Sequence, residues 1–258
     1  MNDTRRSPLR DAHLDRDAAA HVPQTPQSQS PSYRLAFADD DFMCQDQLRP
    51  VRLQLELLKC EMELDAAGIE STVVLFGGAR VPAPDQEARH PGLARLAHFY
   101  DEAREFARRM TRKALACDNR DWVIVTGGGP GVMEAGNRGA LDEGGKSIGL
   151  NIVLPFEQVP NAYVTPELTF NFHYFAIRKM HFLMRARAVC VFPGAFGTMD
   201  EVFETLTLIQ TGRMRPVPVL LFGQSFWESV LNLQALADAG TISAEDLDLF
   251  RFVETAEE

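Results

Sequence analysis

Short runs of consecutive apolar residues recur along the chain, and they are separated by longer segments in which apolar positions follow helical spacing. Runs of this kind predict buried strands at residues 73–76, 122–125, 148–153, 168–172, 188–192 and 217–222. Helical spacing predicts helices from residue 49 to a stop at Gly68, and over residues 93–116, 132–141, 175–185, 198–210 and 226–237. Continuous apolar strands that alternate with helices are typical of a parallel sheet. The pattern therefore predicts an α/β fold, a Rossmann-like open parallel sheet with helices on both faces.

The first part of the chain lacks this pattern. Residues 23–32 form a low-complexity polar stretch, and no glycine occurs before Gly68. Such a segment has little apolar surface with which to offset the entropy lost on ordering. We therefore expect a flexible, disordered N-terminal arm over residues 1–45, followed by a single domain over residues 46–258.

The composition argues against some classes of binding partner. Lys and Arg total 26 against 36 Asp and Glu, which gives a formal net charge of −10. A chain this acidic is poorly suited to bind nucleic acid or an anionic membrane surface. No apolar run approaches the ~20 residues that span a bilayer, and we expect no secretory signal in the polar N-terminus. The scattered cysteines show no metal-ligand spacing, which favours reduced thiols in a cytoplasmic protein without a metal site; they are Cys44, Cys60, Cys117 and Cys190.

Glycine-rich turns follow three of the predicted strands, at residues 77–78, 127–129 and 194–197, the last with glycine at both ends. In an open α/β sheet, ligands bind beyond the carboxyl ends of the strands, where glycine lets backbone N–H groups approach a phosphate. Three such loops in one chain favour an anionic ligand. The dinucleotide motif GxGxxG is broken, because Val132 stands at its third glycine, so a nicotinamide cofactor is not supported.

Two segments carry side chains suited to chemistry. Arg178 and Lys179 are adjacent on one predicted helix, and Thr198 and Glu201 follow the third glycine loop at the start of the next. Each pair has a structural alternative. Adjacent cations are often a solvated helix face, and Thr198-x-x-Glu201 also fits a capping box in which Thr198 caps the helix. Glu204, one turn after Glu201, is either a second pocket carboxylate or an exposed residue.

Three motifs resemble those of the Lonely Guy family, which was formerly labelled lysine decarboxylase, a label that its chemistry does not bear out. Residues 127–135 (GGGPGVMEA) resemble its GGGxGxMxA segment, Arg178-Lys179 match its RK pair, and residues 193–201 (PGAFGTMDE) resemble its PGGxGTxxE signature. The resemblance covers about residues 48–235, and the N-terminal extension makes the chain similar to the longer bacterial branch. One departure is Ala195, which stands at the second glycine of the signature.

The resemblance implies a cytokinin riboside 5′-monophosphate phosphoribohydrolase, which releases free base and ribose 5-phosphate. It implies that Glu201 stabilises the oxocarbenium-like sugar and that Arg178 offsets charge on the leaving base. The substrate-binding residues that it implies are Gly128, Gly129, Lys179, Gly194, Ala195, Phe196, Gly197, Thr198 and Thr207. It implies a nucleoside 5′-monophosphate substrate, no cofactor or metal, and a homodimer or larger homo-oligomer. A broader purine nucleotide nucleosidase acting on AMP and a non-catalytic nucleotide sensor remain open as alternatives.

Overall fold

The computed structural model describes residues 9–155 and 159–258, and residues 1–8 of the predicted arm therefore lie outside the described residues. The chain divides into two compact units, Met1–Leu55 and Glu56–Glu258, and each is described by itself. Helix α3 (Arg49–Ala66) crosses the division between them.

The described part of the first unit consists of short helices joined by turns. Its elements before α3 are α1 (Ala12–Ala20), η1 (Pro31–Tyr33), η2 (Ala36–Ala38), α2 (Asp40–Met43) and η3 (Asp46–Leu48). Acidic side chains cap two of them, because Asp11 accepts a hydrogen bond from the N–H of His13 and Asp39 accepts one from the N–H of Phe42. No residue of α1 is buried. The unit contributes little apolar core, and the flexibility of residues 1–45 stays a prediction.

The second unit is built on a seven-stranded sheet in which each neighbouring pair of strands runs parallel. The strands are β1 (Thr72–Phe76), β2 (Val123–Thr126), β3 (Ser147–Ile152), β4 (Thr169–Phe172), β5 (Ala186–Val191), β6 (Val219–Phe222) and β7 (Arg251–Val253). Every residue of β1 and β2 is buried, as expected for central strands of a sheet that is covered on both faces. The predicted Rossmann-like α/β fold is confirmed.

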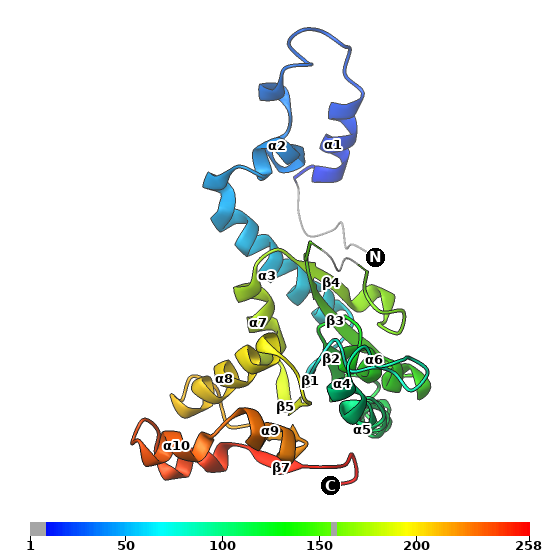
Figure 1. Cartoon of the computed structure of the whole chain (residues 1–258). Helices are drawn as coiled ribbons and strands as arrows, with labels where there is room; N and C mark the ends of the chain where they lie inside the picture. Colours follow the sequence, from blue (N-terminus) through cyan, green and yellow to red (C-terminus); the bar gives the residue numbers. More distant parts are fainter. Residues whose placement is uncertain (1–8, 156–158) are drawn as a thin grey trace. The chain divides into compact units, whose positions relative to one another are not determined.

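Helices cover both faces of this sheet. They are α4 (Pro91–Leu96), α5 (His98–Leu115), α6 (Val132–Asp142), α7 (Phe175–Met184), α8 (Phe196–Gln210), α9 (Gln224–Val230) and α10 (Leu233–Asp238), with η4 (Pro166–Leu168) before β4 and η5 (Ala244–Leu249) before β7. Figure 1 shows α4, α5 and α6 on one side of the sheet and α7 and α8 on the other.

The strand order β4-β3-β2-β1-β5-β6-β7 contains one reversal, between β1 and β5. The chain runs outward from β1 to β4, returns to the centre through α7, and then runs outward again from β5 to β7. Loops that leave adjacent strands toward opposite faces open a crevice at the carboxyl end of the sheet. The loops after β1 and β5 therefore border the position at which this fold binds ligands.

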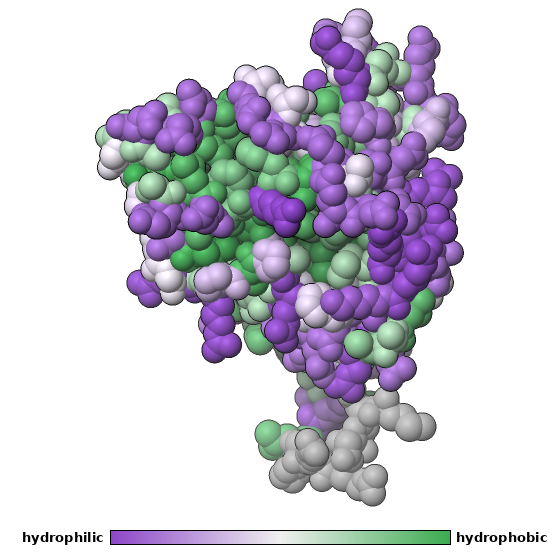
Figure 2. All heavy atoms as spheres, turned by 90° about the horizontal axis from the view of Figure 1, so that it is seen from below, coloured by the Kyte–Doolittle hydropathy of each residue, from purple (hydrophilic) through white to green (hydrophobic). Residues whose placement is uncertain are grey.

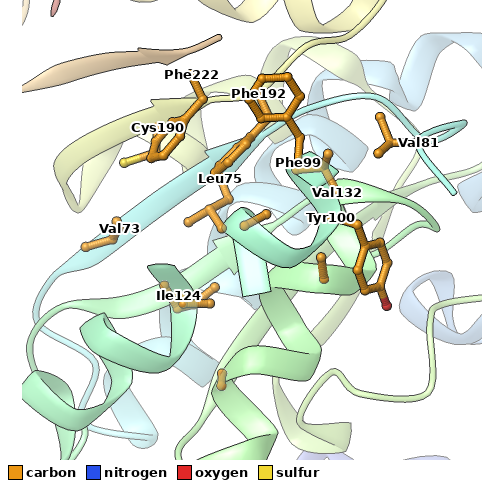
Figure 3. Packing of buried hydrophobic residues seen from close by; sticks show 14 of the residues in the cluster. Val73, Leu75, Val81, Phe99, Tyr100, Ile124, Val132, Cys190, Phe192 and Phe222 are labelled. Atoms are coloured by element: carbon orange, nitrogen blue, oxygen red, sulfur yellow. The ribbon is translucent and has the colours of Figure 1, made fainter. Parts of the chain in front are cut away.

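The main apolar core lies between the sheet and helices α5 and α6. Figure 3 shows side chains of the central strands meeting Phe99 and Tyr100 of α5 and Val132 of α6. Phe192 and Phe222 stack with ring centroids 4.1 Å apart, which extends the core toward β6. This core holds the carboxyl ends of β1, β5 and β6 in fixed relative positions.

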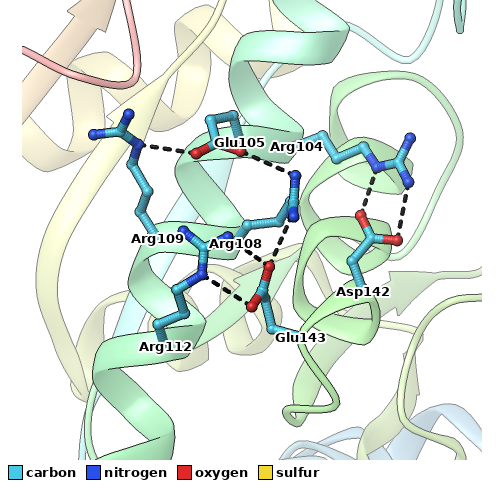
Figure 4. Close-up of polar contacts among 7 residues, drawn as sticks. All are labelled: Arg104, Glu105, Arg108, Arg109, Arg112, Asp142 and Glu143. Carbon is cyan, nitrogen blue, oxygen red and sulfur yellow. Dashed lines mark hydrogen bonds and ion pairs between the residues drawn. The ribbon is translucent and has the colours of Figure 1, made fainter.

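Helices α5 and α6 are also joined by ion pairs at their surface (Figure 4). Arg104 makes a bidentate pair with Asp142, and Arg108 and Arg112 both contact Glu143. These side chains are partly exposed to solvent, which screens their charges, so each pair contributes little to stability. The network joins α5 to α6 and does not shape a ligand site, because none of its residues lies at the carboxyl ends of the strands.

Two predicted helices are wrong in their extent, and one strand was not predicted. The segment 93–116 divides at Ala97 into α4 and α5. The segment 226–237 divides into α9 and α10, because Leu231 is extended and Asn232 caps α10 by accepting from the N–H of Ala235. Strand β7 is only three residues long, too short for an apolar pattern, and pairing with β6 defines it.

Apolar side chains also reach the surface of the second unit. Those of α7 and α8 that are exposed are Phe175, Met180, Met184, Phe196 and Phe203. Figure 2 shows apolar surface over the left half of the face seen from below, the side on which α8 and α10 lie in Figure 1. Exposed apolar surface favours association with another chain, and the homo-oligomer stays a prediction. Among the described residues, no helix is both long and apolar enough to cross a membrane.

Candidate functional site

A cavity of about 720 Å³ opens at the reversal in strand order. Its lining comes mainly from the loops after β1, β2, β3 and β5 and from helices α4, α6, α7, α8 and α9. The polar and glycine-rich part of the lining consists of Gly77, Gly78, Arg80, Gly127, Arg178, Gly194, Gly197, Thr198, Asp200 and Glu201, and the apolar part includes Leu93, Leu96, Ile152, Leu154, Phe175, Phe182 and Phe226. The cavity has the size and mixed character of a small-molecule site.

The loop after β2 is held by a buried network of amides and hydroxyls. The N–H of Gly128 donates to Oγ1 of Thr126 at 3.0 Å, and the carbonyl of Gly128 accepts from the N–H of Asn161 at 2.8 Å. The Asn161 amide also donates to the carbonyl of Gly129 at 3.0 Å. These bonds fix the backbone of the glycine loop, and Gly128 and Gly129 do not line the cavity.

Helix α7 begins at a carboxylate supplied by α3. The two oxygens of Glu56 accept from the backbone N–H groups of His173 and Tyr174, at 2.7 and 3.1 Å. A negative charge at this end of a helix satisfies unpaired donors and interacts favourably with the helix dipole. Glu56 thereby fixes the start of the helix that carries Arg178.

Arg178 is partly buried against the carboxyl ends of β2 and β3. Its Nε donates to the carbonyl of Leu150 at 2.7 Å, and its guanidinium lies 5.1 Å from the centre of the Phe182 ring. Burial lowers the pKa of Arg178 below its usual value, and the charge of Glu201 opposes this effect. A Cβ at Gly127 would lie 2.6 Å from Nη2 of Arg178 and 2.7 Å from Sδ of Met133, so the absence of a side chain at residue 127 leaves space for the guanidinium at its present position. The sequence analysis places Gly127 in a glycine loop but does not predict its position beside Arg178.

The loop after β5 leads directly into α8. The helix begins at Phe196, and its N-cap residue, Ala195, makes no side-chain capping bond. Thr198 is the third residue of the helix, so the capping-box interpretation of Thr198 and Glu201 is wrong: the helix starts two residues before Thr198. The first N–H groups of a helix have no acceptor within it. Because residues 194–198 all line the cavity, these donors lie where an anion would meet them.

Glu201 lies on the face of α8 that packs into the protein. The buried residues of this helix are Thr198, Glu201, Val202, Thr205 and Ile209. Glu201 is 6% exposed, and its Oε2 atom accepts no hydrogen bond from the described residues. Burial raises the pKa of Glu201 to about 7, although the nearby cations Lys179 and Arg178 act in the opposite direction. The result is a poorly solvated carboxylate that lines the cavity and titrates near neutral pH.

Lys179 joins α7 to α8 and does not line the cavity. Its Nζ lies 3.0 Å from the Asp200 carboxylate and 2.9 Å from Oε2 of Glu204, and its side chain is only 15% exposed. Burial by itself would lower the pKa of Lys179, but the hydrogen bonds with Glu204 and Asp200 raise it overall. Arg178 and Lys179 are therefore not a solvated helix face, and Glu204 is an ion-pair partner of Lys179 rather than a pocket carboxylate.

The structure brings together some of the predicted site residues and separates others. Those around the cavity are Arg178, Glu201, Gly194, Ala195, Phe196, Gly197 and Thr198, and those outside its lining are Gly128, Gly129, Lys179 and Thr207. Thr207 is exposed, two turns beyond Glu201 on α8. Sequence reasoning missed Arg80, whose signal was its position two residues after Gly78 of the first glycine loop.

Comparisons with known proteins match a part of the chain that contains many of these cavity residues. A family model described as "Possible lysine decarboxylase" matches residues 133–258, which include Arg178, Lys179 and residues 193–201. Among curated proteins, none matches this chain.

Three solved structures are similar over 73% of this chain. The X-ray structure of TM1055 has 20% identity, coverage of 95% of its own chain and a TM-score of 0.49. A molybdenum cofactor binding protein from Rippkaea orientalis has 16% identity, 91% coverage and a TM-score of 0.48. The molybdenum cofactor carrier protein from Chlamydomonas reinhardtii has 16% identity, 92% coverage and a TM-score of 0.45.

Proposed function

We infer that the chain belongs to the Lonely Guy family, because a family model described as "Possible lysine decarboxylase" matches residues 133–258, and from that premise we propose that it hydrolyses the N-glycosidic bond of an N6-modified adenosine 5′-monophosphate. The products are the free base and ribose 5-phosphate. Family membership indicates a nucleotide-processing enzyme, and the specific reaction is our proposal. The observation that carries it is the convergence of Arg178, Glu201 and the loop of residues 194–198 on one cavity.

The chemistry requires a cation to be stabilised at the sugar. As the bond between the anomeric carbon and the base nitrogen breaks, positive charge develops on the ribose ring, and water then forms the new bond to carbon. Glu201 supports this step because its carboxylate is buried and Oε2 has no competing hydrogen bond. An ionised carboxylate in such a site interacts more strongly with a developing cation than one in water does.

The leaving base receives the electron pair of the broken bond and takes up a proton. In the overall reaction this proton comes from the attacking water, whose oxygen stays on the sugar. Arg178 supports the departure of the base, because a guanidinium held by Leu150 and stacked over Phe182 offers fixed donors to a base that gathers negative charge. Arginine stays protonated at neutral pH, so its role is electrostatic rather than that of a proton donor.

The preference for a modified base is supported by the apolar part of the lining. Leu93 and Leu96 of α4, Ile152 and Leu154 after β3, and Phe226 of α9 surround space in the cavity that offers few polar partners. An apolar substituent on the adenine N6 atom would leave water for such a surface, at a gain of roughly 0.8 kcal/mol per buried CH₂ group. Plain AMP lacks this contribution.

The test is a panel of nucleoside 5′-monophosphates, with free base and ribose 5-phosphate both quantified. We expect equimolar products, a higher kcat/KM for N6-alkylated AMP than for AMP, and a kcat/KM for adenosine about two to four orders of magnitude below that for AMP, because two or more charge-assisted bonds to phosphate are lost. Glu201→Gln should lower kcat about 10²- to 10³-fold or more, whereas the exposed Glu228→Gln should leave it unchanged. Equal rates on AMP and its N6-alkyl derivatives would favour a broad purine nucleotide nucleosidase. Tight nucleotide binding without any product would instead identify a non-catalytic sensor.

A further inference from the structure

We propose that Arg80, in the loop after β1, binds the phosphate of the substrate and supplies the positive charge that the rest of the cavity lacks. The inference rests on the proposed function, because it takes a nucleoside 5′-monophosphate as the ligand. It adds a residue from the first glycine loop, which lies outside the three motifs that carry the family resemblance.

The charge balance of the cavity makes an additional cation necessary. A phosphate monoester carries about −1.5 to −2 charges at neutral pH. Among the described residues, the charged side chains in the lining are Arg80, Arg178, Asp200 and Glu201. Asp200 is paired with Lys179, and Arg178 interacts with the charge of Glu201, so Arg80 is the remaining cation of the described lining. The start of α8 adds only about half a positive charge. A dianion at residues 194–198 therefore needs a guanidinium directed to it.

The other two cations of the site are already engaged. Arg178 donates through Nε to Leu150 and lies against Phe182, beside the buried carboxylate of Glu201. Lys179 is held between Asp200 and Glu204 and lies outside the lining. Moving Lys179 to a phosphate would break both ion pairs and leave the buried oxygen of Glu204 without its cation.

Arg80 lies close to the loop that would hold the phosphate. The structure gives it no ion pair or hydrogen bond with the residues it describes, and its side chain is exposed. Two residues earlier, the N–H of Gly78 donates to the carbonyl of Pro193 at 2.9 Å, which joins the loop after β1 to the loop that leads into α8. The flexible stem of Arg80 thus starts beside the α8 N-terminus and ends in a planar fork that suits two phosphate oxygens.

A second observation points to a bound ligand in this cavity. Glu201 is more than nine-tenths buried, lines the same cavity and has an oxygen without a hydrogen-bond partner among the described residues. A protein rarely buries a polar atom in this way unless a bound group or water satisfies it. A ligand whose sugar lies at Glu201 and whose phosphate lies at residues 194–198 would have Arg80 within its reach.

The experiment compares Arg80→Gln and Arg80→Lys with Arg89→Gln, an exposed arginine farther along the same segment that does not line the cavity. Equilibrium binding of AMP and adenosine is measured by calorimetry on the Glu201→Gln background, so that AMP is not consumed. We expect Arg80→Gln to weaken AMP binding about 10- to 100-fold, the effect of losing a charge-assisted phosphate contact, and Arg80→Lys to restore part of it. Adenosine binding and the melting temperature should be unchanged, and Arg89→Gln should match the parent.

The proposal is overturned if Arg80→Gln binds AMP as tightly as Arg89→Gln does, or if AMP and adenosine weaken equally. Its failure is distinguishable from failure of the proposed function. If the wild-type protein releases base from AMP derivatives while Arg80 has no effect on AMP binding, only the inference on Arg80 fails. If no nucleotide is cleaved but AMP binding still depends on Arg80, the hydrolase proposal fails and the phosphate contact stands.

Discussion

Replacing Glu201 by glutamine is expected to lower activity and raise stability at the same time. The substitution keeps the size of the side chain and removes its charge. If the carboxylate stabilises the developing sugar cation, its loss should lower kcat about 10²- to 10³-fold or more, as for other electrostatic groups in a buried site. The effect on stability follows from the same burial.

Burial raises the pKa of Glu201 from 4.5 to about 7, so ionisation is harder in the folded state than in the unfolded chain. A carboxyl group whose pKa is raised by folding does not lower the free energy of unfolding at pH values below its unfolded pKa. As pH rises from about 4.5 through 7, the protein loses stability because the buried group resists ionisation. A difference of about 2.5 pH units at about 1.36 kcal/mol per unit is about 3 kcal/mol. Glutamine does not ionise, so the variant should escape this loss. The two proteins should be nearly equal in stability at about pH 4.5, and the variant should be more stable by up to about 3 kcal/mol at about pH 8.

The assay is urea unfolding of wild type, Glu201→Gln and the exposed control Glu228→Gln at both pH values, together with product release at pH 8. Extrapolated free energies of unfolding resolve a difference of this size. A variant that is less stable than wild type at pH 8 would refute the reasoning. It would mean that Arg178 and Lys179 stabilise the carboxylate more than burial penalises it, and that part of any lost activity reflects a weakened fold.

Three further predictions use other parts of the site. The kcat/KM of the wild-type enzyme should fall as pH decreases through about 7, because protonation removes the charge of Glu201, and a pH–rate profile that is flat from pH 6 to 8 would contradict this. Gly194→Ala should lower kcat/KM for AMP at least about tenfold while sparing adenosine, because the new Cβ would lie 2.1 Å from Oγ1 of Thr198 and displace that hydroxyl from the phosphate loop. Deleting residues 1–40 should leave kcat/KM unchanged within about twofold, because the described cavity lining begins at Phe76; lost activity with a change in oligomer size by light scattering would show instead that the arm takes part in assembly.

The fold was predictable because its signal is local. Strand β1 is apolar at nearly every position and buried at all of them, and the same agreement between pattern and burial holds for β2. The chemistry-bearing helices were also predictable, since a glycine loop directly before α8 places residues 194–198 at a helix start whatever lies around them. Periodicity did not predict the divisions of helices near Ala97 and Asn232. At Asn232 a side-chain cap starts the second helix, whereas Ala97 makes no side-chain capping bond.

The partners of each side chain were decided by the tertiary structure. Gly127 and Arg178 are 51 positions apart in the chain, yet the absence of a Cβ at one makes room for the guanidinium of the other. Lys179 directly follows Arg178 in sequence, but the helical turn directs it to Asp200 and Glu204 instead of the cavity. The raised pKa of Glu201 likewise arises from the layers packed around α8. The sequence by itself determined which residue types stand at the ends of which strands, and the reversal between β1 and β5 determined which of them meet, because contacts across a sheet depend on strand order, which no local pattern encodes.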